Sequence, residues 1–225
     1  MAVGVVAVVG RGSLALKLLE RVVSSDYPVL VHDPAEPDPE ARWAWLEGDL
    51  DRAVASGLLT DDQRQRMRRE VVVDPRELCL GECDLVLEAE AAILHDKHRL
   101  LSGLQGGMSP GATLVACSST LPVDRFAPRL PFPEQFLAAA IPLPITDPWR
   151  VTLRTTERTA PGVVAAAGYF FQALGAQADE VQVAEPAGTL AAPTGWEGAT
   201  SGLPSWGTSA VEVVGLGTMG GFDGE

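Results

Sequence analysis

The residue types with the most specific chemical spacing lie at positions 10–15. The stretch reads Gly10, Arg11, Gly12, Ser13, Leu14 and Ala15. It follows an apolar, β-branched run at 3–9 and precedes apolar residues at helical spacing, the context in which a GxGxxG/A motif binds a dinucleotide. The first glycine allows a tight turn, the second lets a diphosphate approach the backbone, and N–H groups at the helix start bind the anion. All six residues are therefore predicted to contact a dinucleotide.

Asp33 is the second candidate, because it ends the next apolar run, at 29–31. A carboxylate in that place accepts hydrogen bonds from the ribose hydroxyls of adenosine and repels a 2′-phosphate, which favours NAD over NADP. Two alternatives remain open. Folds that bind S-adenosylmethionine also combine a glycine-rich first turn with an acidic residue after the second strand, and the turn could be purely structural.

The other chemically reactive side chains give weaker signals. His95 and His98 have a spacing that can bind metal, but a third ligand is not apparent, and Cys79 and Cys83 lack a second ligand pair for zinc. We expect no metal. A basic cluster could meet the phosphates of a CoA or carrier-protein arm, although a helix face with paired acids is favoured. It consists of Arg64, Arg66, Arg68 and Arg69.

Composition limits the classes of partner. The chain has 225 residues, 46% of them hydrophobic, which is enough for a large buried core. Its net charge of −13 disfavours nucleic acid and anionic lipid as partners. The apolar N-terminal run is too short to cross a bilayer and lacks the features of a secretory signal. We expect a cytoplasmic protein with no membrane partner and with reduced cysteines.

The elements that would position these residues alternate between strand and helix. Expected strands cover 3–9, 29–31, 71–73, 84–88, 111–116 and 136–141, and expected helices cover 14–23, 35–47, 50–59, 92–104 and 163–174. A further helix begins at Thr60, which forms a capping box with Gln63. Residues 1–185 are predicted to form one Rossmann-type α/β domain, a doubly wound, mostly parallel sheet with helices on both faces.

Residues 186–225 differ in composition. They are rich in Gly, Pro, Ser and Thr and show little periodicity, so an irregular tail is predicted. The segment 211–220 repeats the strand-and-glycine pattern of the N-terminus, but too few residues follow it in this sequence for a second nucleotide-binding domain.

Five segments together resemble the N-terminal NAD-binding domain of the 3-hydroxyacyl-CoA dehydrogenases, over about residues 3–188. They are VVGRG at 8–12, VHD at 31–33, SGLLTDDQ at 56–63, CDLVLEAE at 83–90 and SSTLP at 118–122. The resemblance implies NAD as cofactor and, as reaction, hydride transfer between NAD and a 3-hydroxyacyl thioester of fatty acid metabolism, carried by CoA or an acyl carrier protein.

The same family suggests an origin for the tail. Residues 214–218 are similar to a stretch in the family's helical C-terminal domain, which closes over the acyl-CoA and forms the dimer. The resemblance thus implies that 186–225 is a remnant of that domain. It also adds a homodimer to the partners to be considered.

Three positions match residues that the family uses. Ser119 matches the active-site serine, which contacts the substrate oxygen and the cofactor, Lys97 matches a lysine beside the cofactor, and Ala89 matches a residue whose backbone contacts the cofactor. These matches support NAD binding.

Four other positions do not match. The family's general base histidine falls on Ala140, its asparagine on Leu143, the glutamate that orients the histidine on Thr152, and a cofactor-side glutamate on Ala92. A methyl side chain cannot accept the hydroxyl proton, and general-base catalysis commonly contributes about 10²–10⁴-fold.

Two hypotheses follow. The first is an NAD-dependent oxidoreductase with a degenerate active site, in which Ser119 holds the substrate oxygen. The second is a non-catalytic protein that binds a dinucleotide or a protein partner.

Overall fold

The computed structural model describes residues 3–33, 36, 38–73, 77–90, 94–118, 121–142, 145 and 147–184. The tail predicted at 186–225 lies outside the described residues, and so do Ser119, Leu143 and Ala92.

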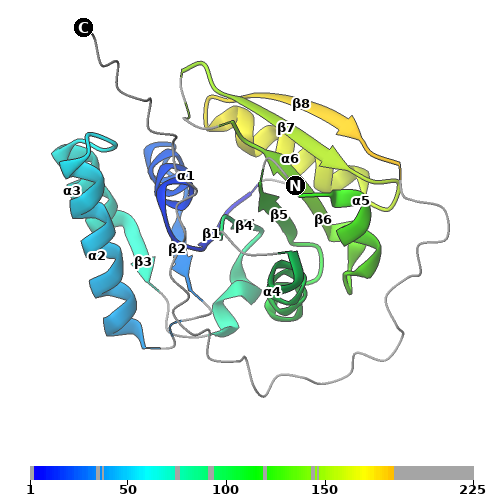
Figure 1. The fold of residues 1–225 in the computed structure, drawn as a ribbon, viewed down its shortest axis with the longest axis horizontal. Coiled ribbons are helices and arrows are strands. Elements are labelled where there is room, and N and C mark those ends of the chain that lie inside the picture. The colour runs from blue at the N-terminus through cyan, green and yellow to red at the C-terminus, as the bar shows by residue number, and fades with distance from the viewer. Residues whose placement is uncertain are drawn as a thin grey trace, which may run out of the picture.

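An eight-stranded sheet runs through the domain in the order β3-β2-β1-β4-β5-β6-β7-β8. The strands are β1 (Val6–Val9), β2 (Val29–His32), β3 (Val71–Val73), β4 (Leu85–Glu88), β5 (Thr113–Cys117), β6 (Phe136–Ala140), β7 (Arg150–Thr155) and β8 (Gln177–Gln182). Neighbouring strands are parallel except for the β6–β7 pair, so β7 and β8 run opposite to the other strands. Figure 1 shows β3 and β8 near opposite ends of the molecule.

Helices connect the strands. They are α1 (Ser13–Ser24), α2 (Pro39–Ala55), α3 (Asp61–Glu70), α4 (Leu94–Gly107), α5 (Val123–Phe126) and α6 (Pro161–Ala173), with short 3-10 helices at η1 (Glu77–Glu82), η2 (Ala127–Arg129) and η3 (Pro133–Gln135). The capping box predicted at Thr60 is present, because its side chain accepts from the Gln63 N–H and the Gln63 side chain accepts from the Thr60 N–H.

Alternate residues of the central strands point to two separate cores. Val6 and Val8 of β1 pack with helices α1, α2, α3 and α6 on one face of the sheet. Ala7 and Val9 of the same strand pack with α4 and α5 on the other face. A strand covered on both faces must be apolar throughout, which explains the uninterrupted runs in the sequence. The predicted fold class, a doubly wound α/β sheet, is confirmed.

The structure differs from the sequence prediction at several elements. Residues 39–55 form one continuous helix where two helices were expected, at 35–47 and 50–59. Leu46 and Leu50 are both buried one turn apart, so the apolar stripe continues through Gly48. The strands β7 and β8 and the short helix α5 were not predicted.

Candidate dinucleotide-binding site

Predicted cofactor residues from three segments meet at the carboxyl ends of β1, β2 and β4. In the register of the sheet, Val9 lies beside His32 on one side and beside Glu88 on the other. The residues that follow these three, Gly10, Asp33 and Ala89, therefore leave the sheet at one edge. Parallel α/β sheets bind their ligands at this edge.

The first two glycines of the motif have different structural requirements. Gly10 has φ +115°, and a Cβ there would lie 2.6 Å from the backbone nitrogen of Glu90. Only glycine fits this close approach. Gly12 has φ +91°, and a Cβ there would meet nothing within 4 Å, so the backbone at Gly12 is open on that side. Gly12 is also the N-cap of α1 and makes no side-chain capping bond, which suits an anion at the helix start.

Asp33 is almost fully buried and is paired with Arg11. The Arg11 Nε donates to Asp33 Oδ2 at 2.6 Å, and a terminal guanidinium nitrogen contacts the same oxygen. Asp33 has 2% of its surface exposed, whereas 38% of the Arg11 side chain is exposed. The guanidinium also lies over the Trp45 ring of α2, 4.7 Å from its centroid. Arg11 thus covers the carboxylate that was predicted to hold the ribose.

Glu90 brings a second carboxylate to the glycine turn. Its Oε2 accepts the backbone N–H of Arg11 at 3.0 Å. Burial raises the pKa of Glu90, the Arg11 N–H opposes this, and the nearby negative charge of Asp33 adds to the increase. Glu90 therefore takes up a proton at a higher pH than an exposed glutamate.

Lys97 and Glu88 form a buried ion pair behind the turn. The Lys97 Nζ lies 2.7 Å from both carboxylate oxygens of Glu88 and donates to the Glu90 backbone carbonyl at 2.6 Å. Glu88 Oε1 in turn accepts the Glu90 N–H at 2.7 Å. Burial raises the pKa of Glu88 and the charge of Lys97 partly offsets this. The pair fixes the backbone of Glu90, which supports the glycine turn.

Two positions to which the resemblance assigns the family's base and its orienting carboxylate lie opposite each other. Ala140, the last residue of β6, is paired with Thr152 of β7 across the antiparallel ladder. Ser119 and Leu143 cannot be placed relative to them, since both lie outside the described residues.

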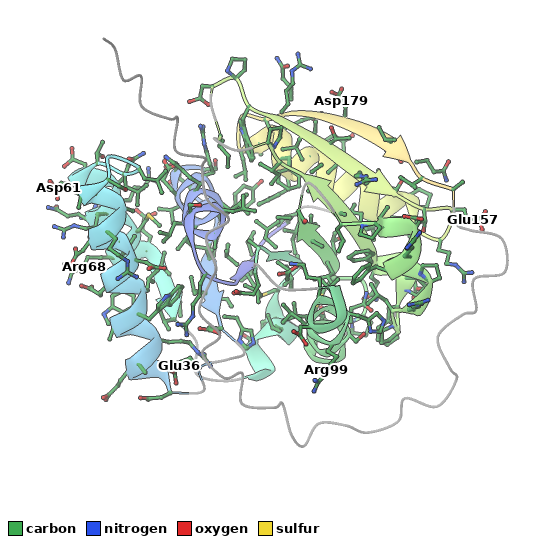
Figure 2. All side chains as sticks on the ribbon, viewed as in Figure 1. Glu36, Asp61, Arg68, Arg99, Glu157 and Asp179 are labelled. Atoms are coloured by element: carbon green, nitrogen blue, oxygen red, sulfur yellow. The ribbon has the colours of Figure 1, made fainter. Side chains whose placement is uncertain are left out.

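Three of the α3 arginines pair with acids. Arg64 contacts Asp51 at 2.5 Å, Arg66 contacts Asp26 at 2.6 Å, and Arg68 contacts Glu47 at 2.6 Å. Figure 2 shows Arg68 and Asp61 on the outer side of the helix pair formed by α2 and α3. The favoured interpretation, a helix face with paired acids, is therefore confirmed.

In the part of the chain that the structure describes, no three His, Cys, Asp or Glu residues are grouped as a metal site would need. No helix among these residues combines the length and the apolar character needed to cross a membrane.

Sequence reasoning missed the partners within the site. Trp45, Glu88 and Glu90 were not predicted as site residues. The signal available was the acidic pair itself, at the end of a strand that lies next to the glycine turn.

The arrangement fits a dinucleotide. The open backbone at Gly12 and the uncapped start of α1 suit a diphosphate, and Asp33 stands at the end of β2, where it can accept from a ribose hydroxyl. A ribose hydroxyl there would share Asp33 with Arg11. The fold and the site define a Rossmann-type dinucleotide-binding domain.

The comparisons with known proteins identify the family. The family "3-hydroxyacyl-CoA dehydrogenase, NAD binding domain" matches residues 5–184, and the chain belongs to it. NAD is the cofactor of this domain.

A curated 3-hydroxybutyryl-CoA dehydrogenase of Bradyrhizobium diazoefficiens is 22% identical over 144 residues, which cover 63% of this chain and 49% of that protein. The chain thus spans about half the length of this curated relative.

Solved structures share the fold. FadB2 of M. tuberculosis aligns with a TM-score of 0.67 and 25% identity, covering 81% of this chain and 65% of that one. The (S)-3-hydroxybutyryl-CoA dehydrogenase PaaH1 of Ralstonia eutropha aligns with a TM-score of 0.66 and 18% identity, covering 80% and 64%.

Proposed function

We propose that this chain binds NAD(H) without catalysing the family's base-assisted oxidation of 3-hydroxyacyl thioesters. The observation that carries the proposal is the Ala140–Thr152 pair. A base and the carboxylate that orients it need neighbouring positions, and the register brings these two positions together. Neither a methyl group nor a threonine hydroxyl accepts a proton at neutral pH.

Each retained residue has a role in binding. Gly10 permits the turn, the α1 N–H groups and the Gly12 backbone receive the diphosphate, and Asp33 accepts from the adenosine ribose. Lys97 acts on the opposite side of the turn, where it holds the Glu90 carbonyl and neutralises Glu88. When bound, NAD supplies the hydride acceptor, and this chain orients it.

The alternative is an oxidoreductase with a degenerate active site. It is favoured by the family match and by relatives that are named as 3-hydroxybutyryl-CoA dehydrogenases. In that case the substrate is a 3-hydroxyacyl thioester carried by CoA or an acyl carrier protein, Ser119 holds its oxygen, and solvent or a displaced residue takes the proton. Under this alternative we also propose a role in fatty acid metabolism, a cytoplasmic location and a homodimer.

The test separates binding from turnover. NADH is titrated against the protein by cofactor fluorescence, and acetoacetyl-CoA is then added while absorbance at the nicotinamide band is followed. We expect saturable NADH binding and no turnover. Turnover that falls when Ser119→Ala is introduced would overturn the proposal in favour of the alternative, and the absence of NADH binding would overturn both.

A rescue variant tests the reason for inactivity. Ala140→His with Thr152→Glu restores a base and its orienting carboxylate at paired positions, and Ala140→Gln with Thr152→Glu is a control of similar size that lacks the base. We expect reduction of acetoacetyl-CoA only in the histidine variant. Equal rates in both variants would show that the Ala140–Thr152 pair is not the cause of inactivity.

A further inference from the structure

The Arg11 guanidinium presents a cation where the adenosine ribose of a dinucleotide would lie. Its Nε and a terminal nitrogen contact Asp33 Oδ2, and its central carbon lies over the Trp45 ring. Asp33 is 2% exposed while the Arg11 side chain is 38% exposed. A ligand that approaches this place therefore meets the cation before the carboxylate.

The charge at this place decides which dinucleotide is accepted. A bare carboxylate after the second strand accepts from a 2′-hydroxyl and repels a 2′-phosphate, whereas an arginine there accommodates the phosphate. In this chain the carboxylate is neutralised by the arginine. The other terminal nitrogen of the guanidinium, on the edge away from Asp33, is suited to a charge-assisted bond with a phosphate oxygen.

Two further contacts hold Arg11 in this position. Its backbone N–H donates to Glu90 Oε2 at 3.0 Å, which anchors the residue within the glycine turn. Its guanidinium lies 4.7 Å from the Trp45 centroid, a stacking arrangement that favours a planar cation. Arg11 is thus held through its backbone N–H, through the guanidinium nitrogens that contact Asp33, and through the guanidinium face that contacts Trp45. Moving the side chain away from this position would break its ion pair with Asp33.

We propose that the site accepts the 2′-phosphate of NADP(H) as well as the 2′-hydroxyl of NAD(H), and that Arg11 sets the preference by neutralising Asp33. This inference rests on the proposed dinucleotide binding. It goes beyond it because the family's cofactor, NAD, has no 2′-phosphate.

The experiment compares NADH and NADPH, each titrated by cofactor fluorescence against the same protein. For the unaltered chain we expect dissociation constants within about tenfold of each other. Arg11→Gln removes the charge and exposes Asp33, so NADPH should weaken by about tenfold or more relative to NADH. Asp33→Asn, with Arg11 retained, should shift the preference further toward NADPH.

Two controls make the outcome specific. Arg150→Gln removes the same charge on β7, from a side chain that is 68% exposed, and should leave both dissociation constants unchanged. Arg11→Lys keeps the charge but loses the planar guanidinium. It is the more conservative change, so it still tests the role of Arg11 if Arg11→Gln does not fold. We expect it to bind NADPH more tightly than Arg11→Gln and less tightly than the unaltered chain.

The possible results are distinguishable. NADH binding with NADPH weaker by clearly more than about tenfold in the unaltered chain would overturn the inference and leave the proposed function intact. A preference that Arg11→Gln and Arg11→Lys both leave unchanged would also overturn it, whatever Asp33→Asn does. Failure of both dinucleotides to bind would overturn the proposed function itself.

Discussion

Removing Lys97 should destabilise the domain because its partner is fully buried. The Lys97 Nζ lies 2.7 Å from both oxygens of Glu88, a residue with 0% of its surface exposed. Lys97→Met deletes the charge but keeps most of the side-chain volume, leaving a buried carboxylate without its counter-ion. Breaking such a pair typically costs about 3–5 kcal/mol. For a domain of this size that corresponds to a decrease in Tm of roughly 10 °C.

The pH dependence gives the expected loss a second signature. Burial already raises the pKa of Glu88, and removing Lys97 raises it further because the lysine charge lowers it. Above that pKa the folded protein holds an unpaired buried anion, whereas below the ordinary value of 4.5 the carboxyl is neutral in both folded and unfolded states. The deficit relative to the unaltered chain should therefore be largest at neutral pH and shrink as the pH falls toward 5.

Urea unfolding at pH 7 and at pH 5 measures both effects. Lys17→Met on α1 is the matched control, with an expected change within about 0.5 kcal/mol. Glu88→Gln combined with Lys97→Met should recover most of the loss, since the glutamine carbonyl can still accept the Glu90 N–H. A loss below about 1 kcal/mol for Lys97→Met, or one that does not change with pH, would refute this account of the pair.

Three further changes test other parts of the structure. Gly10→Ala places a Cβ 2.6 Å from the Glu90 nitrogen at φ +115°, so we expect a loss of about 3 kcal/mol in urea unfolding and of NADH binding in titration; unaltered binding would contradict the turn geometry. Glu90→Gln removes a carboxylate beside the diphosphate position, so NADH should bind more tightly at pH 7. Because burial raises the pKa of Glu90, the affinity of the unaltered chain should increase as the pH falls toward 5 while that of Glu90→Gln stays level, and parallel profiles would argue against this role. Thr60→Ala breaks the capping box and should cost about 1 kcal/mol with NADH affinity unchanged; a weakened affinity would show that α3 is coupled to the site.

The sequence was sufficient where local pattern decides structure. The run before Gly10, the capping box at Thr60 and the acidic end of β2 each follow from residues close together in the chain. The strand β7 also has a local signal, since Val151, Leu153 and Thr155 alternate as buried residues with more exposed ones, but this alternation was overlooked. The exposed strand β8 has almost no apolar signal, and its place depends on pairing with β7.

The contacts within the site could not be predicted because they join residues far apart in sequence. Glu90 reaches the Arg11 N–H across 79 positions, and it does so only because β4 lies next to β1 in the sheet. The contact of Arg11 with the Trp45 ring depends on where α2 lies relative to the glycine turn. Such pairings depend on strand order and helix placement, which a motif does not specify.

The same internal contacts bear on how a dinucleotide binds. In a glycine turn without such contacts, the N–H groups that bind the anion donate only to water before the ligand arrives. Here a carboxylate already accepts the Arg11 N–H, and Arg11 already neutralises Asp33. Binding therefore exchanges contacts within the protein for contacts with the ligand, and the net gain is smaller than the contacts would suggest. A dinucleotide that retains the Arg11 contact while gaining its own phosphate bond loses least in this exchange, which is the physical reason to expect tolerance of a 2′-phosphate.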